Sequence, residues 1–203
     1  MASFPHFYEK TLVLLKPDAV KRGLIGEIIS RFERRGLKIS ALKMVSPARE
    51  QIEAHYFEDE AWLKTLAEKT QETFSELGID VKEHMGTDDK LTIGRLIRGW
   101  LIDYLLEGPI VAMVIEGLHA VSIVRKIVGH TLPAKAEPGT IRGDFSIDSN
   151  SIANLTKRSV RNLIHASGNL KEAEREIKHW FSENEIYDYQ RSDVEVMFKN
   201  SQK

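Results

Sequence analysis

The stretch Thr11–Gly36, TLVLLKPDAVKRGLIGEIISRFERRG, contains a buried strand and the helix that follows it. The run Thr11–Leu15 is almost entirely apolar and stops at Lys16-Pro17-Asp18, which is typical of a fully buried strand ended by a turn. Gly36 stands where a glycine commonly ends a helix. The residues before it recur at helical spacing on one face: Ile25, Ile28, Ile29 and Phe32.

The chain continues with alternating strand and helix patterns. Leu37–Val45 alternates apolar and polar residues, residues 110–115 form a second apolar run, and Ala120–Val128 has helical spacing. Asn162–His165 predicts a short last strand and Leu170–Phe181 a last helix. This βαββαβ order is that of the ferredoxin-like α+β sandwich. We therefore expect a four-stranded antiparallel sheet with helices on one face and a more open face elsewhere.

Two stretches indicate insertions into this single domain, at about residues 57–98 and 148–158. The first is polar, rich in Glu, Lys and Thr, and too long for an ordered loop, so it should carry helices of its own. It leads into an amphipathic helical pattern formed by Ile93, Leu96, Ile97, Trp100, Leu101, Tyr104 and Leu105. We expect this insertion to lie over the existing helices without building a second core, docked through Trp62, Leu63, Leu66 and Phe74.

The composition excludes several classes of protein. The 203 residues carry a net charge of −1, so the chain as a whole is not a polycation for nucleic acid or anionic lipid. It has no cysteine, which excludes disulfides, thiolate metal sites and cysteine catalysis and agrees with a cytoplasmic location. No apolar run is long enough for a signal peptide or a membrane span.

The residues that could carry chemistry surround a histidine. P-loop, zinc-protease, hydrolase and protein-kinase motifs are missing from the sequence. His165 ends a short strand just before a helix, and Asn169 with Glu172 has capping-box spacing, so a helix N-terminus that favours phosphate lies beside it. A neutral imidazole attacks phosphorus when one nitrogen is free and the other is held, and Glu176 is placed to hold it.

Each of these candidates also has a simpler explanation. Lys16 could be a solvated strand end, Arg125 a solvated helix face, and Glu176 an exposed helix residue. Arg142 could form a loop ion pair with Asp144. Tyr56 could equally be a core aromatic residue and Thr131 an ordinary helix-exit residue. The residues by themselves therefore predict a phosphate site with a histidine.

Five segments in order make the chain resemble the nucleoside diphosphate kinase family. They cover nearly all of the chain outside the two insertions, and PGTIRGDF with NLIHAS is a very specific combination. The segments are TLVLLKPDAVKRGLIGEIISRFERRG, GPIVAMVIEGLHAV, PGTIRGDF, NLIHASGN and AEREIKHWF.

The resemblance implies transfer of the γ-phosphate of a nucleoside triphosphate to a nucleoside diphosphate. The reaction would be ping-pong through a phosphohistidine on His165, with Mg²⁺ on the nucleotide phosphates and with Ser167 and Glu176 orienting the histidine. It places the nucleotide contacts on Lys16, Tyr56, Arg125, Thr131, Arg142 and Asn162. Lys16 and Asn162 would also reach the sugar hydroxyls, Arg125 and Thr131 the distal phosphates, and Arg142 the transferring group. Lys16 and Arg142 would both be catalytic.

The resemblance also implies partners. ATP, ADP, GTP and GDP would be substrates, and the chain would form a homo-oligomer, a hexamer or a tetramer built from a common dimer. No membrane and no specific nucleic acid is expected as a partner. The alternative is a nucleotide-binding regulatory or interaction module on the same fold, which the presence of His165 with its Lys and Arg partners disfavours.

The chain departs from the family pattern near the histidine and at the base. Ala166, Gly168 and Leu132 replace the usual Gly, Asp and Asn. The first insertion replaces the segment that supplies an aromatic platform for the base. Phe57, Trp62 and Ile97 are the candidates for that platform.

Overall fold

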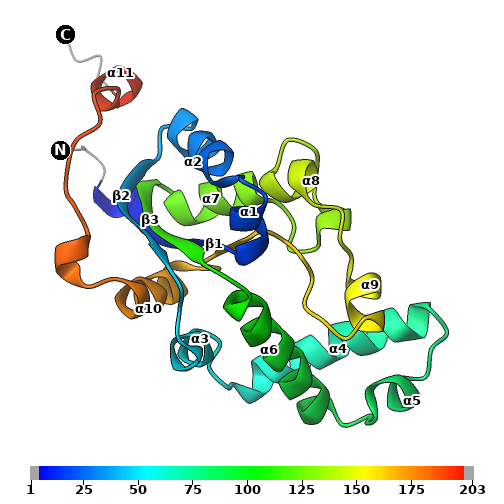
Figure 1. Ribbon diagram of the computed structural model, residues 1–203. Coiled ribbons are helices and arrows are strands. Elements are labelled where there is room, and N and C mark those ends of the chain that lie inside the picture. The colour runs from blue at the N-terminus through cyan, green and yellow to red at the C-terminus, as the bar shows by residue number, and fades with distance from the viewer. Residues whose placement is uncertain (1–4, 199–203) are drawn as a thin grey trace.

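The computed structural model describes residues 5–198, and its centre is a four-stranded antiparallel sheet (Figure 1). The strands are β1 (Tyr8–Leu15), β2 (Lys38–Val45), β3 (Ile110–Leu118) and β4 (Ile164–Ala166), in the order β2-β3-β1-β4. β1 pairs with β3 along the whole length of β1, and β4 pairs with β1 so that His165 lies opposite Leu14. This order and direction confirm the ferredoxin-like sandwich.

The helices follow the expected order and add several short ones. α2 begins at Ile25 and ends at Arg34, and Gly36 just beyond it has a φ of +85°. The α-helices are α1 (Pro17–Lys21), α2 (Ile25–Arg34), α3 (Arg49–His55), α4 (Glu60–Glu76), α5 (Val81–Met85), α6 (Lys90–Leu106), α7 (Ala120–Val128), α8 (Ile141–Phe145), α9 (Asn150–Leu155), α10 (Leu170–Trp180) and α11 (Val194–Phe198).

Helices cover both faces of the sheet, so the expectation of an open face was wrong. Val13 and Leu15 of β1 pack on one face with α2 and α7. Leu12 and Leu14 pack on the other face with residues of α3, α6 and α10. Because side chains alternate along a strand, the unbroken apolar run of β1 supplies one core on each face.

The stretch predicted to be the first insertion builds a small core of its own, contrary to the expectation that it would only dock. α4, α5 and α6 enclose Ala67, Phe74, Met85 and Ile93 in a separate apolar cluster, which we call the inserted core. It lies at one end of the molecule, away from the sheet (Figure 1). Of the expected docking residues, Phe74 belongs to this core, and Leu63 is fully buried.

The two stretches predicted to be insertions contact each other. The Asn150 side-chain amide, at the start of α9, donates to the Thr73 hydroxyl of α4 at 2.6 Å.

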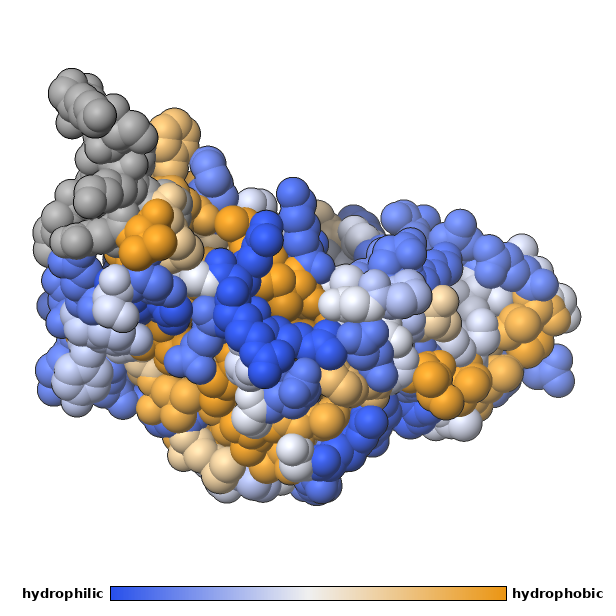
Figure 2. Space-filling view, turned by 90° about the horizontal axis from the view of Figure 1, so that it is seen from above, coloured by the Kyte–Doolittle hydropathy of each residue, from blue (hydrophilic) through white to orange (hydrophobic). Residues whose placement is uncertain are grey.

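On the surface seen from above, apolar side chains lie among hydrophilic ones (Figure 2). Within residues 5–198, no helix combines the length and apolar character needed to cross a bilayer.

Candidate active site

His165 follows a strained turn that joins two chain segments. The Ile164 N–H donates to the Asn162 carbonyl at 2.7 Å around Leu163, whose φ is +66°. A γ-turn with a positive central φ is rare and strained, above all at a residue with a side chain. The fully buried Leu163 is fixed by an N–H bond to the Asp18 carboxylate at 3.2 Å, and its carbonyl accepts from the Lys16 N–H at 2.8 Å. The turn therefore places Lys16 beside the histidine strand.

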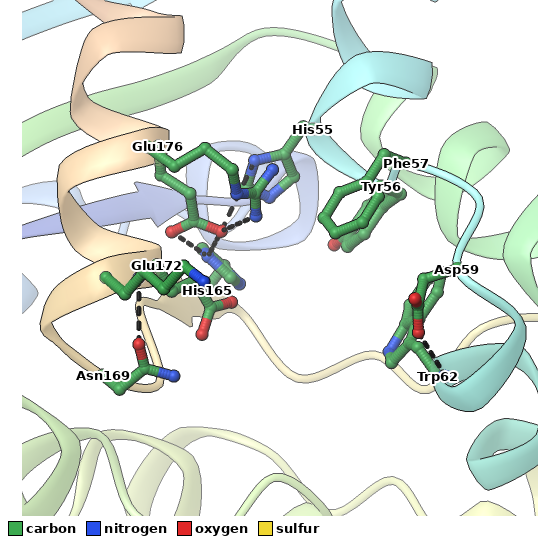
Figure 3. Close-up of a pocket in the computed structure, with 11 residues that line it drawn as sticks. His55, Tyr56, Phe57, Asp59, Trp62, His165, Asn169, Glu172 and Glu176 are labelled. Carbon is green, nitrogen blue, oxygen red and sulfur yellow. Dashed lines mark hydrogen bonds and ion pairs between the residues drawn. The ribbon is translucent and has the colours of Figure 1, made fainter.

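Glu176 on α10 holds the imidazole of His165 (Figure 3). The His165 Nε2 lies 3.1 and 3.0 Å from the two carboxylate oxygens. A carboxylate only accepts, so Nε2 carries the hydrogen and Nδ1 keeps its lone pair. The Ser167 hydroxyl donates to the same carboxylate at 2.7 Å and accepts from the Leu12 N–H.

The protonation state of Glu176 is set by these contacts. Burial alone would raise its pKa, but the nearby His165 imidazole and the hydrogen bonds lower it to about 2. The side chain is almost fully buried, so its alternative reading as an exposed helix residue was wrong. Glu176 is thus a carboxylate that accepts hydrogen bonds from its neighbours.

The N-terminus of α10 is capped differently from the expected box. The Asn169 side chain accepts from the Glu172 N–H at 2.9 Å, as predicted. The Glu172 carboxylate, however, accepts from the Gly168 N–H at 2.8 Å and not from that of Asn169. The capping side chains therefore order the chain directly after His165.

Two buried cations lie beside the histidine strand. Lys16 is only 4% exposed and its ammonium donates to the Asn162 amide oxygen at 2.7 Å. Arg142 is 7% exposed and donates to the carbonyls of Asn162, Gly129 and Ile164. In the described part of the chain, neither makes a salt bridge with an acid. Buried charges without a counter-charge are costly, which points to an anionic ligand.

The pKa values of these cations reflect their burial. Burial, reinforced by the charge of Arg142, lowers the pKa of Lys16 to about 7. Burial, followed by the charge of Arg125, lowers the pKa of Arg142 to about 10. The charge of Arg142 therefore acts on Lys16, and that of Arg125 acts on Arg142.

The structure rejects the simpler explanations of Lys16 and Arg142. Lys16 is not a solvated strand end, and Asp144 pairs with Arg31 at 2.6 Å instead of with Arg142. Arg125 is exposed, but a Cβ built on Gly168 would lie 3.7 Å from its guanidinium, which places it next to the histidine loop.

Asn162 connects the remaining expected contacts. Its side-chain amide donates to the Thr131 carbonyl at 2.9 Å, and its own N–H donates to the Tyr104 hydroxyl at 3.2 Å. The Tyr104 ring also lies 4.8 Å from the Lys16 ammonium. Sequence reasoning had placed Tyr104 only on the apolar face of a helix, so this contact was missed.

A cavity of about 520 Å³ opens over the imidazole. Its walls come from the start of α4 and from α10, and the residues that line it include Tyr56, Phe57, Trp62, His165 and Glu176. The Trp62 and Tyr56 rings are parallel, with centroids 6.0 Å apart. Of the three candidate base platforms, Phe57 and Trp62 therefore line the cavity, while Ile97 packs against the inserted core. Lys16, Arg125, Thr131, Arg142 and Asn162 are not among the residues that line it.

His55 at the end of α3 is a second residue that sequence reasoning missed. It is 3% exposed, and its ring lies edge-on against that of His165 with centroids 4.7 Å apart. Its only signal in the sequence is its position next to Tyr56, because no motif singles it out.

Comparison with known proteins identifies relatives along most of the chain. The family model for nucleoside diphosphate kinase matches residues 9–76 and 97–186. A nucleoside diphosphate kinase of Pyrobaculum aerophilum is 56% identical over 178 residues, which is 88% of this chain and 97% of that protein. One of Archaeoglobus fulgidus is 40% identical over 94% of this chain and 98% of its own length.

Solved structures of nucleoside diphosphate kinases also match the fold of this chain. The crystal structure of an NDP kinase from Pyrobaculum aerophilum has a TM-score of 0.87 at 53% identity and covers 89% of this chain and all of its own. A transition-state mimic of the nucleoside-diphosphate kinase from Borrelia burgdorferi, with bound vanadate and ADP, has a TM-score of 0.75 at 37% identity and covers 94% of this chain and 97% of its own.

Proposed function

The chain belongs to the nucleoside diphosphate kinase family, a family of phosphotransferases, and we propose that its phosphoryl transfer runs through a phosphohistidine on His165. One observation carries this proposal. Glu176 accepts from Nε2, so Nδ1 of the imidazole retains its lone pair, and His165 lines the cavity. Two buried cations without acidic partners lie close by, as a phosphate site requires.

The reaction would consist of two displacements at phosphorus. In the first, the Nδ1 lone pair of His165 attacks the γ-phosphorus, an N–P bond forms, the bond to the bridging oxygen breaks and the diphosphate leaves. In the second, a terminal oxygen of another diphosphate attacks that phosphorus and the N–P bond breaks. Glu176 keeps the Nε2–H throughout.

The cations would stabilise the charge on the transferring group. Phosphoryl transfer depends mainly on positioning and on stabilising charge at the equatorial oxygens. We assign this role to Lys16 and Arg142, with Arg125 and Thr131 on the distal phosphates. Arg142 is well suited because three backbone carbonyls fix its guanidinium before a ligand binds.

Mg²⁺ would be held by the nucleotide phosphates. Among the described residues, the one cluster with three potential metal ligands contains His55, His165 and Glu176, and Mg²⁺ prefers oxygen to these imidazole nitrogens. The residues present thus fit a metal that arrives with the nucleotide. When bound, it would neutralise phosphate charge.

The sugar and base would lie where Asn162 and the aromatic residues are. We assign the sugar hydroxyls to Lys16 and Asn162, and the base to the wall formed by Tyr56 with Phe57 or Trp62. Stacking reads no base edge, so ATP, GTP and their diphosphates would all serve as substrates.

We also propose a homo-oligomer, a hexamer or a tetramer built from a dimer, located in the cytoplasm. β2 is an edge strand of the sheet, and Leu42 and Met44 on it are 52% and 56% exposed. An exposed edge with apolar side chains favours pairing with another copy. Light scattering should give a mass several times 23.1 kDa.

Labelling with γ-³²P-ATP tests the proposed nucleophile. We expect one label on His165 that is lost in acid, is stable in base and is removed by any nucleoside diphosphate. His165→Ala should take up no label while still binding ADP. An acid-stable label on a hydroxyl residue would overturn the proposal, and a wild-type protein that binds ADP without being labelled would support a regulatory module instead.

A further inference from the structure

A second imidazole competes for the carboxylate that holds His165. The Nδ1 of His55 lies 3.7 Å from Oε1 of Glu176, the oxygen that is 3.1 Å from His165 Nε2. His55 is buried, so it has no access to bulk solvent. A hydrogen on this Nδ1 would give Glu176 a second imidazole donor.

The indole of Trp180 prevents that. Its Nε1–H donates to His55 Nδ1 at 3.3 Å, and an indole nitrogen is a donor only. Nδ1 must therefore carry a lone pair, which leaves the His55 hydrogen on Nε2. That nitrogen is buried and has no hydrogen-bond partner among the described residues. This tautomer therefore leaves one buried donor unsatisfied, which costs free energy.

The surroundings also keep His55 neutral. Burial lowers its pKa well below the ordinary value, and the neighbouring His165 lowers it further against the opposing effect of Glu176. His179 and Arg175 face the same ring and act in the same direction. A neutral His55 with a free Nδ1 lone pair cannot donate to Glu176.

We propose that His55 and Trp180 are a positioning pair that reserves Glu176 for the nucleophile. Trp180 fixes the tautomer of His55. In this tautomer the His55 ring packs edge-on against His165 and donates no hydrogen bond to the Glu176 carboxylate. This inference rests on the proposed role of His165, because the pair acts only through the orientation of that imidazole.

Substitution of the indole tests the pair. Trp180→Phe keeps an aromatic ring but removes the N–H, so His55 can move its hydrogen to Nδ1 and donate to Glu176. The rate of His165 phosphorylation should fall roughly tenfold, the effect of one hydrogen bond to a charged group, at unchanged nucleotide KM. In the double variant His55→Phe/Trp180→Phe the competing donor is gone, and most of the lost rate should return.

His179→Phe is the matched control, because it removes a neighbouring imidazole that does not approach Glu176 within hydrogen-bond distance. The loss caused by Trp180→Phe should persist in that background. Equal losses in the His55→Phe and His179→Phe backgrounds would overturn the proposal, as would a wild-type rate in Trp180→Phe.

Nitrogen NMR of the wild-type protein tests the same idea without a variant that could misfold. In ¹⁵N-histidine-labelled protein, His55 Nδ1 should resonate as an unprotonated nitrogen and Nε2 as a protonated one. The opposite tautomer, or an imidazolium, would overturn the inference. Wild-type labelling on a residue other than His165 would instead overturn the proposed function, so the two failures are distinguishable.

Discussion

The protonation states of individual side chains around His165 are determined by neighbouring groups that can only donate or only accept hydrogen bonds. Glu176 only accepts, which determines the tautomer of His165. Arg142 only donates, and the carbonyl oxygens that bind it leave its charge uncompensated, whereas burial lowers the pKa of Lys16 to about 7. The site is therefore charged and oriented before a nucleotide arrives.

Arg142→Ala should lower kcat by about a hundredfold or more, with a smaller effect on nucleotide binding, if its contact strengthens in the transition state. Steady-state kinetics and ADP titration would measure both quantities. Arg31→Ala is a suitable control, because Arg31 pairs with Asp144 of the same segment without reaching the carbonyls around His165. A near wild-type kcat in Arg142→Ala would show that this side chain has only a structural role.

Glu176 should make stability depend on acid pH. Its folded pKa of about 2 lies below the ordinary value of 4.5, so its contribution is complete above about pH 4.5 and is lost as the pH falls towards 2. The full contribution is roughly 3 kcal/mol by the linkage relation. Denaturant unfolding across this range should show a shallower pH slope in Glu176→Gln than in wild type. Glu174→Gln, an exposed substitution on the same helix, should keep the wild-type slope.

At the scale of elements, α4 and α6 pack closely enough to require a glycine. A Cβ on Gly94 of α6 would lie 2.4 Å from the Leu63 carbonyl oxygen of α4, a backbone atom that cannot move alone. Gly94→Ala should therefore lower the melting temperature and disturb the wall that carries Trp62. Gly99→Ala on the same helix meets nothing within 4 Å and should stabilise, by up to about 1 kcal/mol, through helix propensity. Equal melting temperatures in the two variants would contradict this packing.

Sequence predicted the elements whose signals are local. The apolar run of β1 and the helical spacing of α2 and α7 are visible within single segments of the sequence. The segments around Arg142 and His165 resemble a family closely enough to indicate the site. The turn at Leu163 could not be predicted, because leucine rarely adopts a positive φ.

Other features depend on contacts between distant segments. His55 lies more than a hundred residues from Glu176 and Trp180 in the chain, and only the packing of α3 against α10 brings the three together. The inserted core was missed because its apolar residues are scattered over three helices. Periodicity within any one of those helices does not show that they share a core.

For the whole molecule, the inserted core should be less stable than the two cores on the sheet. It buries few apolar residues, and α6 links it to the remainder, since Ile93 belongs to the inserted core and Ile102 to a sheet core. Small apolar clusters with little buried surface open at lower free energy than the main core. Native-state hydrogen exchange should therefore show α4 and α5 opening before β1 and β3.

Bound nucleotide should raise the free energy of opening of α4. Trp62 in the first turn of α4 lines the cavity over His165, so ADP that stacks there binds the closed form of α4 in preference to the open one. Protection of the α4 amides should rise with ADP concentration. α5 lies away from the cavity, so protection of its amides should rise only if α5 opens in the same step as α4. Unchanged exchange of α4 at saturating ADP would mean that the inserted core opens independently of the nucleotide, and that Trp62 does not contact the base.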